Sequence, residues 1–428
     1  MSIVSLICFV VCLAIIASAL RRDADALSPA RVFGFVWAFA IGLTDLKLSG
    51  LQHTWSMSSW VQLLIGVSSF LLGTLFAFVH NLGKPLLSVQ LMRKSWTKDI
   101  DERKLFVSIA VIFALYIFAY VVITFIKGVR PPLFSAKPWI ARHEFTMFAV
   151  GLFLQNVVVV AYFSVVYVLT ARNQKARKWG VLMMTAVSIL TYFFLLQRLQ
   201  IMMTGIVCAT LIYYTTSHLR KSTVVLYFIG TSLFFLLVSS LRAGQVLVLY
   251  LYTTAAMKFS PAYAILTEPY MYVAMNLENF TRAVQKLDTL AYGYYTFDFA
   301  TAVVGLKHWI SEYFGMVETP YLISNYNTYT AFWTYYRDFG VLGIAVIPAL
   351  LGWGIASAYY WLRTNPNIRS LTFYSVAMFV MFMSFFNSPL GFLWFVYNVI
   401  VMYIVLRYIR VRTVPVSSTM RAQLQTSH

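Results

Sequence analysis

Residues 2–20, SIVSLICFVVCLAIIASAL, form an apolar run without a charged side chain, and Arg21 and Arg22 follow directly after it. An α-helix needs about 20 such residues to cross a hydrocarbon core about 30 Å thick. The run lacks the charged region that precedes the apolar part of a secretory signal peptide. We therefore expect it to remain in the protein as the first of several membrane spans.

Similar apolar runs recur along the whole chain. Of its 428 residues, 60% are hydrophobic and only 11% are charged, whereas a soluble domain carries about 25% charged residues. Segments of about 10 residues with alternating polarity, which are typical of a membrane barrel, are not seen. The sequence therefore predicts a single all-α polytopic membrane domain over residues 1–428. We expect about 11 transmembrane helices, at 2–20, 29–50, 60–81, 105–126, 147–171, 180–197, 199–216, 223–241, 332–361, 371–389 and 391–406.

The basic residues predict the orientation of these spans. In a soluble protein a net charge of +19 would suggest a nucleic-acid partner. Here most of the 33 Lys and Arg residues lie in or beside six segments on one side of the predicted spans, namely 23–28, 83–104, 172–179, 218–222, 363–370 and the tail from residue 407. Basic residues collect on the cytoplasmic side of a membrane. This predicts a cytoplasmic C-terminus and an outer N-terminus, and it removes the main support for nucleic-acid binding.

The longest segment without a span lies on the predicted outer side. Residues 243–330 follow the eighth span, and their loop is periplasmic if the host is Gram-negative. Loops this long inside compact proteins are usually functional. Within residues 268–286, Tyr272, Met275 and Phe280 recur at helical spacing, which predicts a helix at or near the membrane interface. We therefore expect one long, partly helical outer loop.

Five arginines lie on the side that topology disfavours: Arg142, Arg198, Arg242, Arg282 and Arg337. A charge at the end of an apolar span costs a few kcal/mol unless it reaches the interface or is paired. A guanidinium offers a planar fork of donors that matches phosphate. For any one of these arginines, a structural ion pair is an equally good interpretation. The set as a whole favours a lipid-linked phosphate or diphosphate as the ligand.

The stretch ARHEF, residues 141–145, places three ionisable side chains directly before a span. Glu144 is a candidate general base, because a carboxylate near the interface can have a raised pKa and so accept a proton from a hydroxyl. His143 is a weaker candidate for the same role. The alternative is a surface ion pair between Arg142 and Glu144.

Further polar residues of the outer side are candidates for holding a glycan or supporting the loop: Glu268, Tyr270, Asn276, His308, Tyr336 and Asp338. Gly340 and Gly343 follow Asp338 and are small enough for close helix packing, although a capped start of a span would explain this stretch as well. The His and acidic residues show no metal-ligand spacing, so we predict no metal site and no cofactor. The three cysteines show no disulfide pattern.

The order of these features resembles the Wzy-type oligosaccharide repeat-unit polymerases of O-antigen and related surface polysaccharides. The likeness covers most of the chain as architecture. Its most specific piece is YYRDFGVLG, residues 335–343. The other pieces are single arginines at span ends, ARHEF before a span, LSPARVFGFVW at 27–37, EPYMYVAMNLENF at 268–280, and NTYTAFWTYYRDFGVLG at 327–343 followed by Pro348 and Gly352.

This resemblance implies a metal-independent glycosyltransferase of the membrane-embedded C superfamily in the bacterial inner membrane. Such an enzyme moves a growing glycan from one undecaprenyl diphosphate to the sugar of another lipid-linked repeat unit. The resemblance implies that Arg142, Arg198 and Arg242 hold the diphosphate leaving group, and that Glu144 or His143 activates the acceptor hydroxyl. The implied partners are an undecaprenyl-diphosphate-linked oligosaccharide, membrane lipid and, potentially, a chain-length regulator protein.

Three other functions stay open. An O-antigen ligase would share the architecture and differ only in its acceptor. A lipid-linked oligosaccharide transporter (flippase) would line a central cavity with cations from mid-span positions, whereas the predicted mid-span regions are nearly free of charge. A scaffold protein without enzymatic activity would explain the aromatic outer loop but not the set of arginines.

Overall fold

The computed structural model describes residues 2–21, 24–96, 100–171, 174–216, 248–287, 289–306, 309–310, 312, 323, 326 and 328–410. Within these ranges the chain is helical, and its strand-like contacts are two isolated bridges, Ser49 with Met257 and Ile100 with Arg410. The prediction of an all-helical fold is confirmed for this part of the chain. The predicted eighth span, 223–241, lies outside the described residues.

Helices, five of them long and four of them short and apolar, lie at the positions of the other predicted spans, and α9 (Lys175–Phe193) belongs to neither group. In chain order they are α1 (Ile3–Leu20), α2 (Pro29–Asp45), α3 (Met57–His80), α5 (Glu102–Val121), α7 (Val150–Phe153) with α8 (Val157–Thr170), α9 (Lys175–Phe193), α10 (Leu199–Thr215), α15 (Ala331–Thr364), α16 (Ile368–Met383) and α17 (Leu393–Tyr408). In the described part of the chain, five helices are long and apolar enough to cross a membrane. Such helices are what a membrane-embedded helical protein requires.

Shorter helices lie between these elements: α4 (Val89–Ser95), α6 (Pro138–Glu144), α12 (Thr267–Lys286) and α13 (Asp298–Val303). One-turn segments join them at Val122–Ile126, Pro132–Phe134, Leu154–Asn156, Pro261–Leu266 and Pro389–Gly391. Of these helices, α12 and α13 lie in the predicted outer loop. α12 has 20 residues and α13 has 6.

Local sequence explains where several helices begin. The Ser2 hydroxyl accepts a hydrogen bond from the backbone N–H of Ser5 at the start of α1, and Ser56 does the same at the start of α3. Asp101 caps α5, and Asn367 forms a reciprocal capping box with Ser370 at the start of α16. Such caps satisfy backbone donors that have no partner within the helix.

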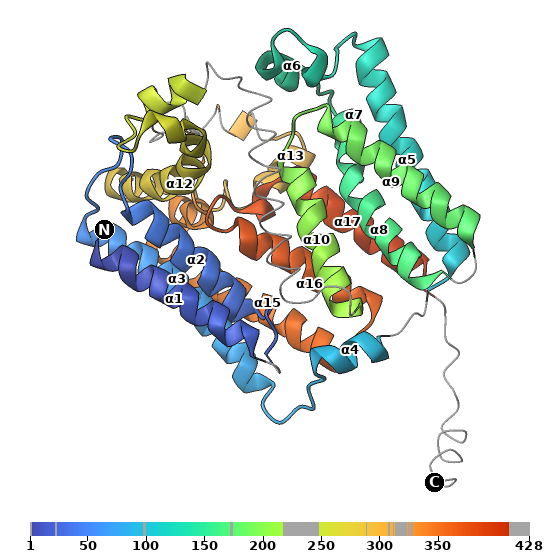
Figure 1. The fold of residues 1–428 in the computed structure, drawn as a ribbon, viewed down its shortest axis with the longest axis horizontal. Coiled ribbons are helices and arrows are strands. Elements are labelled where there is room, and N and C mark those ends of the chain that lie inside the picture. The colour runs from blue at the N-terminus through green and yellow to red at the C-terminus, as the bar shows by residue number, and fades with distance from the viewer. Residues whose placement is uncertain are drawn as a thin grey trace.

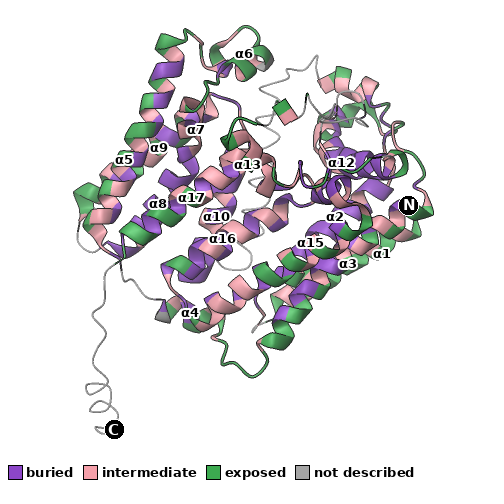
Figure 2. Ribbon diagram, turned by 180° about the vertical axis from the view of Figure 1, so that it is seen from behind, coloured by how far each residue is buried: buried purple, intermediate pink, exposed green. Residues whose placement is uncertain are grey.

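The helices fall into two groups that α16 joins (Figure 1). One group contains α1, α2, α3, α12 and α15, and the other contains α5, α8, α9, α10 and α17. α8 is buried along most of its length, whereas α1 is mainly exposed (Figure 2). Exposed side chains such as Ile3, Phe76 and Phe125 are large and apolar. Water disfavours such a surface, and lipid matches it.

Helices α3 and α15 pack backbone against backbone. A Cβ added at Gly73 would lie 2.0 Å from the Ala349 carbonyl oxygen, and one at Gly352 would lie 2.1 Å from the Phe70 carbonyl oxygen. The two helix backbones therefore touch at Gly73 and at Gly352, because a glycine has no side chain to keep them apart. Further along, Phe332 of α15 stacks on Trp37 of α2 at 4.4 Å between ring centroids.

A break divides α15 near its start. Gly340 adopts φ 61° and ψ −143°, a conformation that essentially only glycine reaches. We predicted that Gly340 and Gly343 allow close packing between helices. Instead, Gly340 turns the chain, and a Cβ at Gly343 would lie 2.0 Å from the carbonyl oxygen of Tyr335 in the same helix. The helical segment 331–339 is therefore separated by a kink from the rest of α15.

The molecule has two ends (Figures 1 and 2). One holds α6 and α12 and is called the α12 end below, and the opposite one holds α4 and is called the α4 end. At the α4 end, the buried carboxylate of Asp25 accepts hydrogen bonds from Tyr214 of α10 (2.9 Å) and Tyr359 of α15 (3.0 Å). Arg363 lies 3.9 Å from the same oxygen. This polar cluster ties the two groups of helices together.

The predicted loop helix is present as α12, but it does not lie on the surface. It packs against α2, α3 and α15, and most of its side chains are buried. Its polar face is buried too. Asn276, Glu278 and Asn279 can be buried because each forms hydrogen bonds with a neighbouring segment. Other segments therefore enclose α12, which apolar spacing alone could not predict, and its position relative to a membrane interface stays a prediction.

Candidate functional site

The structure brings most of the predicted site residues to the α12 end. α6 carries Arg142, His143 and Glu144, Arg198 directly precedes α10, α12 carries Glu268, Tyr270 and Asn276, and α15 carries Tyr336 and Asp338. Arg242 and His308 lie outside the described residues, so their predicted roles stay predictions.

Arg198 is held by α12. Its side chain is 6% exposed, and its Nη2 donates a hydrogen bond to Oε1 of Glu268 at 2.8 Å. The guanidinium carbon lies 5.1 Å from the centre of the Tyr272 ring. An ion pair and a cation–π contact together fix the direction of the guanidinium. The alternative of a structural ion pair is thus realised for Arg198, with Glu268 as its partner.

Arg142 lies half-buried beside this pair. Burial lowers the pKa of the Arg142 guanidinium, Tyr272 opposes this shift, and the positive charge of Arg198 lowers the pKa further. In the described ranges, no carboxylate lies within ion-pair distance of Arg142. The surface pair with Glu144 that we considered is therefore not formed. The positive charges of Arg142 and Arg198 therefore influence each other, and Glu268 pairs with Arg198.

Glu144 and His143 are exposed at the end of α6. Both side chains are open to water in this structure, and their predicted role in accepting a proton stays a prediction. Lys127 donates hydrogen bonds to the carbonyl oxygens of Glu144 (2.6 Å) and Thr146 (2.7 Å). A cation at this position satisfies carbonyls that a helix leaves unpaired at its C-terminal end. Lys127 therefore fixes the end of α6 next to Arg142.

Tyr270 and Asn276 support loops. The Tyr270 hydroxyl donates to Oε1 of Gln52 at 2.6 Å and accepts from the N–H of Leu48 at 2.9 Å. Asn276 accepts a hydrogen bond from the hydroxyl of Thr328. The two side chains join α12 to the loop after α2 and to the segment before α15. In this structure, Tyr270 and Asn276 thus contact other segments of the protein, and a role in holding a glycan stays a prediction.

Glu278 is a central residue that we did not predict. Its side chain is 1% exposed. Oε1 accepts from the N–H of His53 at 2.9 Å and lies 3.3 Å from Nε of Arg282, and Oε2 accepts from Nε1 of Trp55 at 2.8 Å. One carboxylate therefore holds the loop before α3 against α12. The sequence signal was weak, since only the four-residue spacing of Glu278 and Arg282 indicates a pair.

Asp338 and Tyr336 hold neighbouring backbone. Asp338 is fully buried, and its two oxygens accept from the N–H groups of Tyr295 (3.1 Å) and Thr296 (2.5 Å). Tyr336 donates to the carbonyl oxygen of Val284 at 3.4 Å. The first part of α15 therefore positions the loop that precedes α13.

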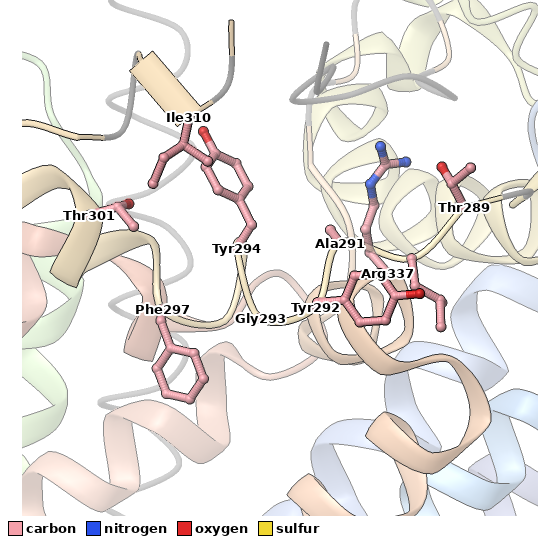
Figure 3. A pocket seen from close by; sticks show the side chains of 10 residues that line it. Thr289, Ala291, Tyr292, Gly293, Tyr294, Phe297, Thr301, Ile310 and Arg337 are labelled. Carbon is pink, nitrogen blue, oxygen red and sulfur yellow. The ribbon is translucent and has the colours of Figure 1, made fainter. Parts of the chain in front are cut away.

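This loop, α13 and Arg337 line a cavity of about 610 Å³ (Figure 3). Arg337 is 8% exposed, and its guanidinium carbon lies 5.1 Å from the ring centre of Tyr295 and 5.5 Å from that of Trp333. Its Nε is buried and makes no hydrogen bond. Burial raises the pKa of the Tyr295 phenol, although the charge of Arg337 works against this shift. The phenol is therefore neutral at neutral pH.

The segment between α16 and α17 contacts residues near Arg198 and near Arg337. Phe386 stacks on Tyr272 at 5.8 Å between ring centroids, and Tyr272 in turn contacts Arg198. Two residues further on, the hydroxyl of Ser388 lies 3.0 Å from that of Tyr335. This short segment therefore contacts Tyr272 beside Arg198 and also α15 two residues before Arg337.

Metal ligands do not gather at the α12 end. In the described part of the chain, no group of three or more His, Cys, Asp or Glu side chains could hold a metal ion. Comparisons with models of protein families, with curated proteins and with solved structures found no match to this chain. Its function must therefore be argued from its own residues.

Proposed function

We propose that this protein is a membrane glycosyltransferase that polymerises oligosaccharide repeat units carried on undecaprenyl diphosphate. The observation that supports the proposal is that Tyr272, which contacts Arg198 at 5.1 Å, is also within electrostatic reach of Arg142, so both arginines border one ring at the α12 end. Like charges repel, and the described carboxylate beside them, Glu268, balances one of the two. A multiply charged anion such as a diphosphate would relieve the repulsion and accept hydrogen bonds from both guanidiniums.

The reaction needs a stabilised leaving group and a base. The acceptor hydroxyl attacks the anomeric carbon of the donor glycan, the bond from that carbon to the diphosphate oxygen breaks, and undecaprenyl diphosphate leaves with the electron pair. Guanidiniums fixed in advance stabilise the growing negative charge by several kcal/mol in a water-poor site. The hydroxyl proton passes to a base, for which Glu144 and His143 are the candidates because they adjoin Arg142 on α6.

The proposal places the α12 end on the periplasmic side of a bacterial inner membrane, with about 11 spans in all. Basic residues at the α4 end support this orientation, because they collect on the cytoplasmic side. They include Lys84, Arg93, Lys94, Arg103, Lys104 and Arg363. The cations of the α12 end would then face the compartment in which lipid-linked glycans are extended.

The decisive experiment uses purified protein in lipid nanodiscs with an undecaprenyl-diphosphate-linked oligosaccharide. We expect a ladder of products one repeat unit apart. Arg142→Gln should slow extension about 100-fold or more, as the loss of a charge-stabilising donor typically does. Arg130→Gln is the matched control, because Arg130 is an exposed cation in the same connection between α5 and α7.

Other outcomes would redirect the assignment. The absence of a ladder, or a full ladder from Arg142→Gln, would contradict the proposal. Transfer of glycan only to a lipid A core acceptor would indicate a ligase. Movement of the lipid-linked glycan across a liposome membrane without any transfer would indicate a transporter.

A further inference from the structure

The cavity beside Arg337 is large enough for a ligand of its own. Its volume of about 610 Å³ lies within the range of small-molecule sites, about 300–1,000 Å³. In Figure 3, Tyr294 and Ile310 stand on one side of the cavity, and Arg337 and Thr289 stand on the other. The loop before α13 forms its floor between them, so three separate parts of the chain build the site.

Arg337 brings an unbalanced positive charge to this cavity. No carboxylate in the described ranges lies within ion-pair distance of its guanidinium. The neighbouring Asp338 directs both oxygens to backbone N–H groups of the loop. Tyr295 is neutral, so its phenol and ring can contact Arg337 but cannot balance the charge of the guanidinium. A buried cation is unfavourable without an anionic partner, and two aromatic rings offset only part of this cost.

The remaining lining suits a sugar. Thr289, Thr301 and Tyr294 provide hydroxyl groups, and Tyr292 and Phe297 provide aromatic surface. Tyr292 is 81% exposed and Phe297 is 54% exposed, so the aromatic surface continues outward from the cavity. A saccharide offers the complementary groups, because its C–H faces pack on rings and its hydroxyls pair with hydroxyls.

We propose that this cavity binds a saccharide residue that carries a carboxylate, such as a hexuronic acid, with the carboxylate on Arg337 and the sugar ring between Arg337 and Tyr294. A carboxylate is planar, accepts two parallel hydrogen bonds from one guanidinium and carries one charge. A phosphate monoester carries a charge of about −1.5 to −2, and Arg337 is the only cation among the described lining residues. Together with the proposed function, this makes the repeat unit an acidic one.

The test measures binding rather than polymerisation. Purified full-length protein in nanodiscs is titrated with methyl β-D-glucuronide and with methyl β-D-glucoside, which lacks only the carboxylate, and binding is followed by saturation-transfer-difference NMR. We expect the glucuronide to bind about 10-fold more tightly, as the loss of a charge-assisted pair predicts. Arg337→Gln should remove this preference, and Arg130→Gln should keep it.

Two further variants guard against misfolding and separate charge from geometry. Thr289→Trp introduces an indole at the cavity from an exposed position, and we expect it to block the glucuronide even if Arg337→Gln fails to fold. Arg337→Lys keeps the charge but loses the planar fork, so it should restore binding only in part.

Several results would overturn the inference. These are equal binding of the two glycosides, glucuronide binding that survives both Arg337→Gln and Thr289→Trp, and inorganic phosphate displacing the glucuronide at lower concentration than free glucuronate does. A product ladder without glucuronide binding would refute the acidic ligand and leave the polymerase standing. Glucuronide binding without a ladder would do the reverse.

Discussion

At the scale of single residues, Glu278 joins three separate segments through one buried carboxylate. It accepts hydrogen bonds from His53 and Trp55 of the loop before α3, and it pairs with Arg282 one turn further along α12. Removing one member of such a buried network leaves donors without partners and a guanidinium without its counter-ion. The position of α12 therefore depends strongly on this side chain.

We expect Glu278→Ala to destabilise the protein by about 1–3 kcal/mol, because the buried Nε1 of Trp55 loses its acceptor, whereas Arg282 is 30% exposed and keeps contact with water. The measurement is the apparent midpoint of thermal unfolding in detergent at one fixed scan rate, because membrane proteins often unfold irreversibly. Lys286→Ala is the control, since Lys286 is exposed at the end of the same helix. Equal midpoints for the two variants would show that the carboxylate does not hold the loop.

The sequence could predict on which side the arginines lie, but not which residues they pair with. The sequence indicated that Arg142, Arg198 and Arg337 belong to one side of the molecule, and in the structure they lie on α6, directly before α10 and on the first part of α15. It did not indicate that Glu268, 70 positions after Arg198, would neutralise that arginine. A pair so distant in sequence depends on which helix ends meet, and spacing along the chain carries no information about that.

At the scale of elements, α15 combines a span with part of a site. Its 34 residues exceed the roughly 20 that a bilayer requires. The break at Gly340 separates the apolar remainder from the segment 331–339, which carries Arg337 and Asp338 to the loop before α13. The apolar remainder packs against α3 through Gly73 and Gly352. One helix thus links the rigid α3 contact to the cavity.

Two glycines of α15 allow a direct test of this packing. A Cβ at Gly352 would lie 2.1 Å from the Phe70 carbonyl oxygen, whereas one at Gly354 meets nothing within 4 Å. We expect Gly352→Ala to destabilise the protein by about 1–3 kcal/mol or more through overpacking. Gly354→Ala should be neutral or stabilising by up to about 1 kcal/mol, because alanine favours a helix. Thermal unfolding in detergent compares them, and equal effects would exclude backbone contact between α3 and α15.

At the scale of the whole molecule, charge distinguishes the two ends. The α4 end carries many basic side chains, among them Lys84, Lys94 and Arg103, and Arg93 there donates to the carbonyl oxygen of Tyr213 at 2.9 Å. At the α12 end, Arg198 pairs with Glu268, and Arg337 lies against the rings of Trp333 and Tyr295. The positive-inside rule concerns the number of basic residues on each side of a membrane, so the proposed orientation rests on the basic residues of the α4 end.

Cysteine labelling in intact cells tests this orientation. Lys84 at the α4 end and Arg130 at the α12 end are both exposed. In a background without Cys8, Cys12 and Cys208, we expect a membrane-impermeant maleimide to label Arg130→Cys in spheroplasts but to leave Lys84→Cys unlabelled. Permeabilised cells should show labelling of both variants. The opposite pattern in spheroplasts would invert the topology and move the proposed site to the cytoplasm.

The length and composition of the apolar runs by themselves determined that the chain is helical and that its helices are apolar enough for a membrane. Lipid offers no hydrogen bonds, so each spanning segment must satisfy its own backbone, and this requirement is readable from sequence. Periodicity likewise predicted a helix where α12 lies. Only the tertiary structure decided that α12 is enclosed, that Arg198 pairs with Glu268 while no described carboxylate pairs with Arg142, and that Arg337 faces a cavity. These outcomes depend on which distant segments meet, because the energy of a buried charge is set by its neighbours in space.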